Sequence, residues 1–281
     1  MMQIKKNNVL RNSEKKPILY DVYFNKTNTT KPIVIFCHGY KGFKDWGAWE
    51  LVAEYFANEG FFFLKFNFSH NGSTLEEPID FPDLEAFSQN NYTKELDDLE
   101  QIITHISSTK QYDQETNTKD INLIGHSRGG GIVLIKAEEN TGVKKVITWA
   151  GVSDYKSRFN IGSDLFNNWK STGRFYVTNG RTKQEMPHDW QFFQDFITNE
   201  NRLTIQRAAE VLKKPLLIIH GIADPTVSID EAKKLQGWTI NSRTHFVENA
   251  NHVFGASHPW DTNSLPNHLE EVVKKSCEFL K

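Results

Sequence analysis

Residues 121–131 read Ile-Asn-Leu-Ile-Gly-His-Ser-Arg-Gly-Gly-Gly, so that an apolar run leads into a Gly-x-Ser-x-Gly pattern. A second apolar run with helical spacing follows at residues 132–137. A serine that acts as a nucleophile must stand clear of its own backbone, and a sharp turn between a strand and a helix achieves this. The turn strains the serine backbone, so the residues two before and two after it must be small. Gly125 and Gly129 occupy these positions, which makes Ser127 the candidate nucleophile.

Strands and helices are predicted to alternate on both sides of this motif. Strands are expected at residues 17–24, 33–37, 61–66, 121–124, 145–150, 215–220 and 244–247. Helical spacing is present at residues 49–58, 92–107, 132–137, 229–235 and 265–280. Several of the strands are apolar without alternation, as is typical of strands that are covered on both faces. The order therefore predicts an α/β fold with a mostly parallel sheet flanked by helices.

One long stretch between two predicted strands lacks the pattern of a buried strand. It is rich in aromatic residues, namely Tyr155, Phe159, Phe166, Trp169, Phe175, Tyr176, Trp190, Phe192, Phe193 and Phe196. A structureless loop of this length is improbable inside a compact domain. We therefore expect residues 155–214 to form an inserted, mainly helical lid on a core of residues 1–154 and 215–281. Most of the aromatic side chains are expected to pack the lid onto the core, and a few to line a pocket.

An acid and a histidine should follow the serine along the chain, each just past a strand. Asp224 lies in such a position, whereas its rival Asp230 begins a predicted helix, where capping explains it. His252 follows a polar loop after the short strand that ends at residue 247. His258, six positions later, is the alternative base. Placement favours Asp224 and His252.

An oxyanion formed at Ser127 would need hydrogen-bond donors that are fixed in advance, and backbone N–H groups serve best. One donor is expected from Arg128, the residue after the serine. The other should come from the loop after an earlier strand, where Gly39 permits a sharp turn and makes the amide of Tyr40 the best candidate. No role is assigned to the side chains of Arg128 and Tyr40.

These segments together resemble the α/β-hydrolase family. The resemblance is carried by His-Gly-Tyr at 38–40, Gly-His-Ser-Arg-Gly at 125–129, His-Gly-Ile-Ala-Asp at 220–224 and His252, in this order and each at a strand end. It covers nearly the whole chain from residue 17. It implies a Ser127–His252–Asp224 triad that transfers an acyl group to water, with no cofactor and no metal.

Two further stretches resemble particular branches of that family. Residues 66–73 resemble the glycine-rich loop of the lidded cinnamoyl (feruloyl) esterases and monoacylglycerol lipase-like enzymes, although Asn67 stands where aspartate is usual. The Gly-His-Ser-Arg-Gly-Gly sequence at 125–130 also resembles prolyl-oligopeptidase-type and dienelactone-hydrolase-type members.

Composition and charge bear on the partners, the location and the cofactors of the protein. The 281 residues carry a formal net charge of −2, which gives no sign of nucleic-acid or membrane partners. No apolar stretch approaches the about 20 residues that span a bilayer, and residues 1–8 are too polar for a signal peptide. The two cysteines, Cys37 and Cys277, are expected to be buried thiols, which favours a cytoplasmic location. The ten histidines form no metal motif, and no nucleotide-binding loop is present.

The sequence thus predicts a carboxylic-ester hydrolase for small-molecule esters with small or aromatic acyl groups. Amide or peptide hydrolysis, thioester hydrolysis and acyl transfer remain alternatives on the same triad. A non-catalytic ligand-binding homologue is a further alternative, although a receptor would not need all three triad residues. The physiological substrate and the oligomeric state do not follow from the sequence.

Overall fold

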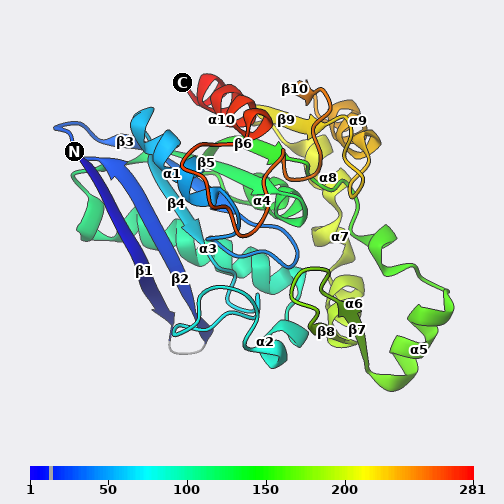
Figure 1. The fold of residues 1–281 in the computed structure, drawn as a ribbon. Helices are drawn as coiled ribbons and strands as arrows, with labels where there is room; N and C mark the ends of the chain where they lie inside the picture. Colours follow the sequence, from blue (N-terminus) through cyan, green and yellow to red (C-terminus); the bar gives the residue numbers. More distant parts are fainter. Residues whose placement is uncertain (13–14) are drawn as a thin grey trace.

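An eight-stranded sheet forms the centre of the protein in a computed structural model, which describes residues 1–12 and 15–281 (Figure 1). The strand order is β1-β2-β4-β3-β5-β6-β9-β10. The strands are β1 (Met2–Asn12), β2 (Lys15–Asn25), β3 (Lys31–Cys37), β4 (Phe62–Phe66), β5 (Thr116–His126), β6 (Val143–Trp149), β9 (Leu216–Gly221) and β10 (Ser242–Val247). The six strands from β4 to β10 in this order are mutually parallel, while β2 is antiparallel to both β1 and β4. The predicted α/β fold is confirmed.

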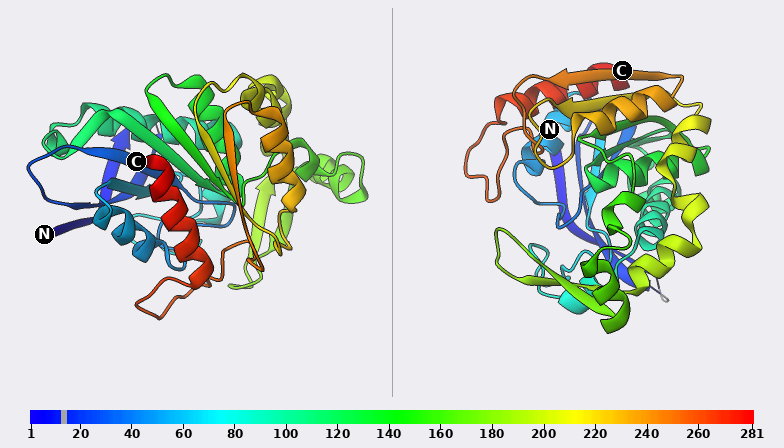
Figure 2. Two further views of the ribbon diagram at one scale, coloured as in Figure 1. Left: turned by 90° about the horizontal axis from the view of Figure 1, so that it is seen from above. Right: turned by 90° about the vertical axis from the view of Figure 1, so that its right-hand side faces the viewer.

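Helices cover both faces of the sheet because its central strands are apolar on both sides. In β3, Ile33 and Ile35 face one core while Val34 and Phe36 face the other, and all four are almost fully buried. The helices α1 (Trp49–Asn58) and α10 (Asn267–Leu280) cover the face of Val34. The helices α3 (Tyr92–Ser108), α4 (Arg128–Glu139) and α9 (Ile229–Trp238) cover the opposite face (Figure 2).

The parallel arrangement determines where the candidate site lies. The carboxyl ends of parallel strands meet at one edge of a sheet, and ligands bind there in open α/β folds. Tyr40, Ser127, Asp224 and His252 follow β3, β5, β9 and β10 respectively, so this edge collects them from distant parts of the sequence.

Residues 155–214, called the inserted segment below, connect β6 to β9. They contain a 3-10 turn (Lys156–Phe159), α5 (Asp164–Thr172), β7 (Arg174–Thr178), β8 (Glu185–Asp189), α6 (Gln191–Thr198), α7 (Glu200–Leu203) and α8 (Ile205–Val211). The antiparallel hairpin of β7 and β8 forms its own small sheet beside α2 (Leu84–Ser88) (Figure 1). The helices agree with the expectation, whereas the hairpin was not predicted. The division into a core and a lid stays a prediction.

Both cysteines are buried and unpaired, as the sequence indicated. Across the described residues, no helix combines the length and the apolar character needed to cross a membrane.

Candidate active site

Ser127 occupies a strained turn between β5 and α4. Its backbone has φ +56° and ψ −120°, a conformation that few residues other than glycine adopt. A Cβ atom added to Gly125 would lie 2.2 Å from the carbonyl oxygen of Gly129. One added to Gly129 would lie 2.6 Å from the carbonyl oxygen of Cys37. The two glycines are therefore required for the strand, the turn and the helix to pack as they do.

Asp224 and His252 form a hydrogen-bonded pair. The Nδ1–H of His252 donates to Oδ2 of Asp224 at 2.7 Å, and the aspartate side chain is fully buried. The other oxygen, Oδ1, accepts the backbone N–H groups of Thr226 and Val227 at 2.8 and 3.0 Å. Burial alone would raise the pKa of Asp224, but hydrogen bonds from His220 and His252 outweigh it and hold the pKa well below its usual range. Asp224 is therefore a fixed carboxylate that orients the imidazole.

The loops that carry Asp224 and His252 are hydrogen-bonded to each other. The N–H of Ile222 donates to the carbonyl of Val247 at 3.0 Å, and that of Ala223 donates to the carbonyl of Ala250 at 3.1 Å. They are also in close contact, since a Cβ atom on Gly221 would lie 2.3 Å from the Ala250 oxygen. The position of Asp224 relative to His252 is thus set by backbone contacts as well as by the side chains.

His126 connects the serine turn to His252. Its Nε2–H donates to the carbonyl oxygen of His252 at 2.9 Å, and the two rings lie 4.9 Å apart between centroids. Burial and the neighbouring His252 lower the pKa of His126 to about 3, so the ring is neutral. Within the described ranges, no hydrogen bond joins the hydroxyl of Ser127 to His252, whereas His126, the residue before the serine, is bonded to the backbone of His252.

The rival residues lie elsewhere. His258 uses Nδ1 to accept the N–H of Gly47 at 2.9 Å, and its ring packs edge-on against Phe43. Asp230 is exposed at the start of α9, where it pairs with Lys233 at 2.9 Å. Neither rival is hydrogen-bonded to the Asp224–His252 pair.

The loop after β3 touches the serine. A Cβ atom on Gly39 would lie 2.8 Å from the Cβ of Ser127. The loop is held by His38, whose Nδ1–H donates to the carbonyl of Gly39 at 2.9 Å and whose Nε2 accepts the N–H of Phe68 at 3.2 Å. Burial lowers the pKa of His38 to about 4, which keeps it in this neutral form. The roles of the Tyr40 and Arg128 amides as oxyanion donors stay a prediction.

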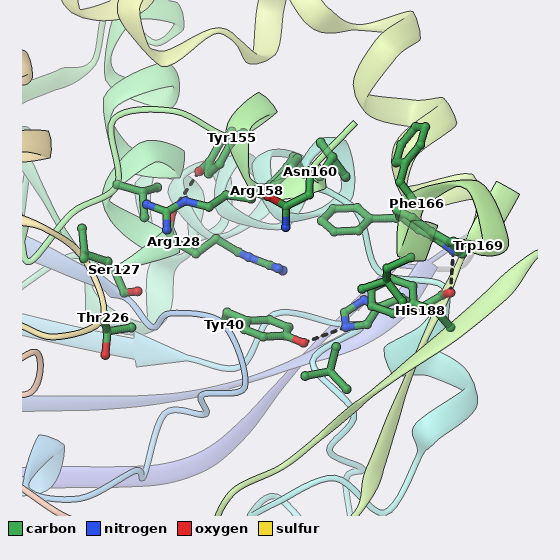
Figure 3. A pocket seen from close by; sticks show the side chains of 18 residues that line it. Tyr40, Ser127, Arg128, Tyr155, Arg158, Asn160, Phe166, Trp169, His188 and Thr226 are labelled. Atoms are coloured by element: carbon green, nitrogen blue, oxygen red, sulfur yellow. Dashed lines mark hydrogen bonds between the residues drawn. The ribbon is translucent and has the colours of Figure 1, made fainter. Parts of the chain in front are cut away.

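A cavity of about 360 Å³ extends from Ser127 under the inserted segment (Figure 3). Its aromatic lining comprises Tyr40, Tyr92, Tyr155, Phe159, Phe166, Trp169, Phe175, His188 and Phe192. Polar lining residues include Arg128, Arg158, Asn160 and Thr226. Figure 3 shows Ser127 near one end and His188 and Trp169 near the other. The cavity can therefore accept an apolar or aromatic group attached to a carbonyl at Ser127.

The side chain of Arg128, to which the sequence assigned no role, lies inside this cavity. Its Nη1 contacts Oε1 of Glu95 at 3.3 Å, and its guanidinium carbon lies 4.4 Å from the Tyr40 ring centroid. Burial alone would lower the pKa of Arg128, but the charge of Glu95 raises it, so the guanidinium stays charged. The sequence could have indicated this pair, because Glu95 is a charged residue on the apolar face of residues 92–107 and a buried carboxylate requires a partner.

A mostly parallel sheet, a strained serine after its fifth strand and an Asp–His pair at the same edge of the sheet are the features of an α/β hydrolase. The chain belongs to the dienelactone hydrolase family, which matches residues 20–281. A search of curated proteins finds no match. In the described part of the chain, no cluster of three or more histidine, cysteine or acidic side chains could hold a metal ion.

Solved structures share the fold at low sequence identity. Est1E from Butyrivibrio proteoclasticus aligns with a TM-score of 0.72 and 17% identity over 98% of both chains. Its complex with ferulic acid aligns with a TM-score of 0.74 and 19% identity over 94% of both chains. Dienelactone hydrolase from Anabaena variabilis aligns with a TM-score of 0.63 and 16% identity, over 99% of this chain and 96% of that one.

Proposed function

We propose that this α/β hydrolase is a serine esterase that cleaves carboxylic esters through an acyl-enzyme on Ser127. The observations that carry the proposal are the strained Ser127 at one end of an aromatic cavity and the hydrogen-bonded Asp224–His252 pair, whose histidine contacts His126, the residue before the serine. His252 Nδ1 donates to Asp224, so the lone pair of its neutral ring is on Nε2. That nitrogen is the base in the mechanism below.

The proposed reaction has two acyl-transfer steps. His252 Nε2 removes the proton of Ser127 as its Oγ attacks the ester carbonyl, and the carboxylate of Asp224 stabilises the imidazolium. The backbone amides of Tyr40 and Arg128 donate to the oxyanion. The imidazolium protonates the leaving alcohol, and a water activated by His252 then releases the acid.

We propose esters of aromatic or small acyl groups as the substrates. Support comes from the aromatic lining of the cavity and from its volume of about 360 Å³. The similar fold of Est1E, which has been solved with ferulic acid bound, is consistent with an aromatic acid in the same cavity. We also propose a cytoplasmic location, for which the two buried, unpaired thiols argue.

Labelling with a fluorophosphonate, followed by assays with ester, amide and thioester substrates, tests the proposal. The wild type should be labelled and should hydrolyse aryl esters. Ser127→Ala should keep the fold, lose the label and lose about 10³-fold or more in kcat. A matched control, Ser171→Ala, alters an exposed serine of α5 and should behave as wild type.

Three outcomes would overturn the ester proposal. Labelling with turnover of amides or thioesters alone would assign one of those reactions instead. Labelling without hydrolysis, but with transfer to added alcohols, would indicate an acyltransferase. Tight binding of aromatic esters without labelling would indicate a binding protein.

The identity of the base is tested separately. We expect His252→Ala to lower kcat nearly as much as Ser127→Ala, because proton removal and orientation by Asp224 both require this ring. His258→Ala should lower kcat far less, since its ring nitrogen is bonded to Gly47. The reverse order, measured on folded variants with an activated ester, would assign the base to His258.

A further inference from the structure

A hydrogen bond connects the inserted segment directly to the loop after β3. The Nε2 atom of His188, on β8, lies 2.6 Å from the hydroxyl oxygen of Tyr40. Both side chains line the cavity, and Figure 3 shows the bond as a dashed line between them. The two residues are 148 positions apart in the sequence, so this bond joins two separate parts of the fold.

The protonation states determine the direction of this bond. Burial and the nearby charge of Arg128 lower the pKa of His188 to about 3, so its ring is neutral. Burial raises the pKa of Tyr40 to about 12, so its hydroxyl keeps its proton. The Tyr40 O–H has no other acceptor in the described part of the chain and therefore donates to Nε2 of His188.

His188 itself is held firmly by the inserted segment. Its carbonyl oxygen accepts the indole N–H of Trp169, on α5, at 2.9 Å. Its ring stacks on Phe175, on β7, with centroids 4.9 Å apart and planes at 20°. A movement of α5 or of the hairpin would consequently be transmitted to His188 and through it to the Tyr40 side chain.

Tyr40 and its neighbour Gly39 lie against Arg128 and Ser127. Its ring stacks on the guanidinium of Arg128 at 4.4 Å, so the side chains of the two proposed oxyanion donors touch. The preceding residue, Gly39, approaches the Cβ of Ser127 so closely that no side chain fits there. A tilt of the Tyr40 side chain should therefore turn the Tyr40 amide, the proposed oxyanion donor.

We propose that His188 is a positioning residue through which the inserted segment aligns the Tyr40 amide for catalysis. The segment that lines the acyl-binding cavity would then also control the rate of acyl transfer. This inference rests on the proposed function. An oxyanion donor acts through its alignment with the transition state, so its displacement should lower kcat while ground-state binding changes little.

Three variants test the link. His188→Phe keeps an aromatic ring but removes the acceptor, Tyr40→Phe removes the donor, and His188→Gln restores an acceptor. With a small activated ester we expect His188→Phe and Tyr40→Phe each to lower kcat about 10-fold with KM within about 2-fold, as misalignment rather than loss of a donor implies. The double variant should be no worse than either single variant. His188→Gln should recover part of the rate, and the control Tyr176→Phe, an exposed phenol on the same hairpin, should match wild type.

Hydrogen–deuterium exchange of the peptide covering residues 38–44 provides a readout that does not depend on catalysis. His188→Phe should accelerate exchange in this peptide, and Tyr176→Phe should not. Unchanged exchange, additive effects on kcat, or an effect on KM alone would each overturn the role of His188. A wild type without esterase activity but with the expected exchange pattern would instead refute the proposed function and leave the mechanical link intact.

Discussion

Three buried histidines outside the proposed triad hold the loops of the site. His38 bonds the loop that carries Tyr40, His126 donates to the carbonyl of His252, and His220 donates through Nε2–H to the carbonyl of Val227 at 2.9 Å. In each case one ring nitrogen is bonded to backbone, and His38 also accepts the N–H of Phe68 through Nε2, which requires a neutral ring. Their common role is to fix backbone that flanks the reacting groups, and acid should weaken the fold through His38, because protonation removes its acceptor nitrogen.

His38 offers a clear test of this idea, because both of its ring nitrogens are engaged. Its pKa is lowered to about 4 from an unfolded value near 6.5. The stability from the neutral ring is thus fully present above pH 6.5 and is lost as the pH falls towards 4, by up to about 1.4 kcal/mol per pH unit. His38→Gln retains one acceptor and one donor but does not titrate, so its free energy of unfolding should depend less on pH in this window.

Urea unfolding of both proteins at several pH values between 4 and 7 measures this difference. Other groups, including Asp98 with its pKa raised to about 7 by burial, titrate in the same range, but they are common to both proteins and cancel in the comparison. Parallel curves for the two proteins would show that His38 is not protonated on unfolding.

At the scale of the elements, apolar sequence patterns predicted some strands and missed others. Strands β3, β4, β6 and β9 are buried on both faces, so their apolar runs predicted them to within a few residues. The hairpin of β7 and β8 was missed because its strands are partly exposed and pair only with each other. The edge strand β1 was missed for a similar reason, since its sequence is mostly polar and it lies at the edge of the sheet beside β2.

Close contact between elements is a further property that a pattern does not reveal. Gly221 ends β9 and meets the loop before His252, where a Cβ atom would lie 2.3 Å from a backbone oxygen. We expect Gly221→Ala to lower the free energy of unfolding by about 2 kcal/mol or more, because backbone must move to admit the methyl group. Gly237→Ala, in α9 with nothing within 4 Å, should instead stabilise the protein by about 0.5–1 kcal/mol. Equal effects in thermal or urea unfolding would contradict this reading of the contact.

At the scale of the whole molecule, topology explains why the candidate triad could be inferred while the cavity could not. A parallel sheet brings the ends of β5, β9 and β10 to one edge whatever the details of packing, so Ser127, Asp224 and His252 could be chosen by position. The cavity depends on which aromatic side chains of the inserted segment turn inward. Tyr155 and Phe159 do so, whereas Tyr176 is 54% exposed. Aromatic content alone does not distinguish these cases.

Alternate residues of β7 provide a test of whether this cavity selects the acyl group. Val177 lines the cavity, while its neighbour Tyr176 points outward because side chains alternate along a strand. Val177→Phe adds a ring to a space of about 360 Å³. We expect kcat/KM for an aromatic acyl ester to fall about 10-fold or more, and that for an acetyl ester to change by about 2-fold at most, since a methyl group needs little of the space. Tyr176→Phe is the matched control and should leave both values unchanged. If Val177→Phe lowered both esters equally, the effect would lie in the chemistry at Ser127, and the acyl group would have to bind outside this cavity.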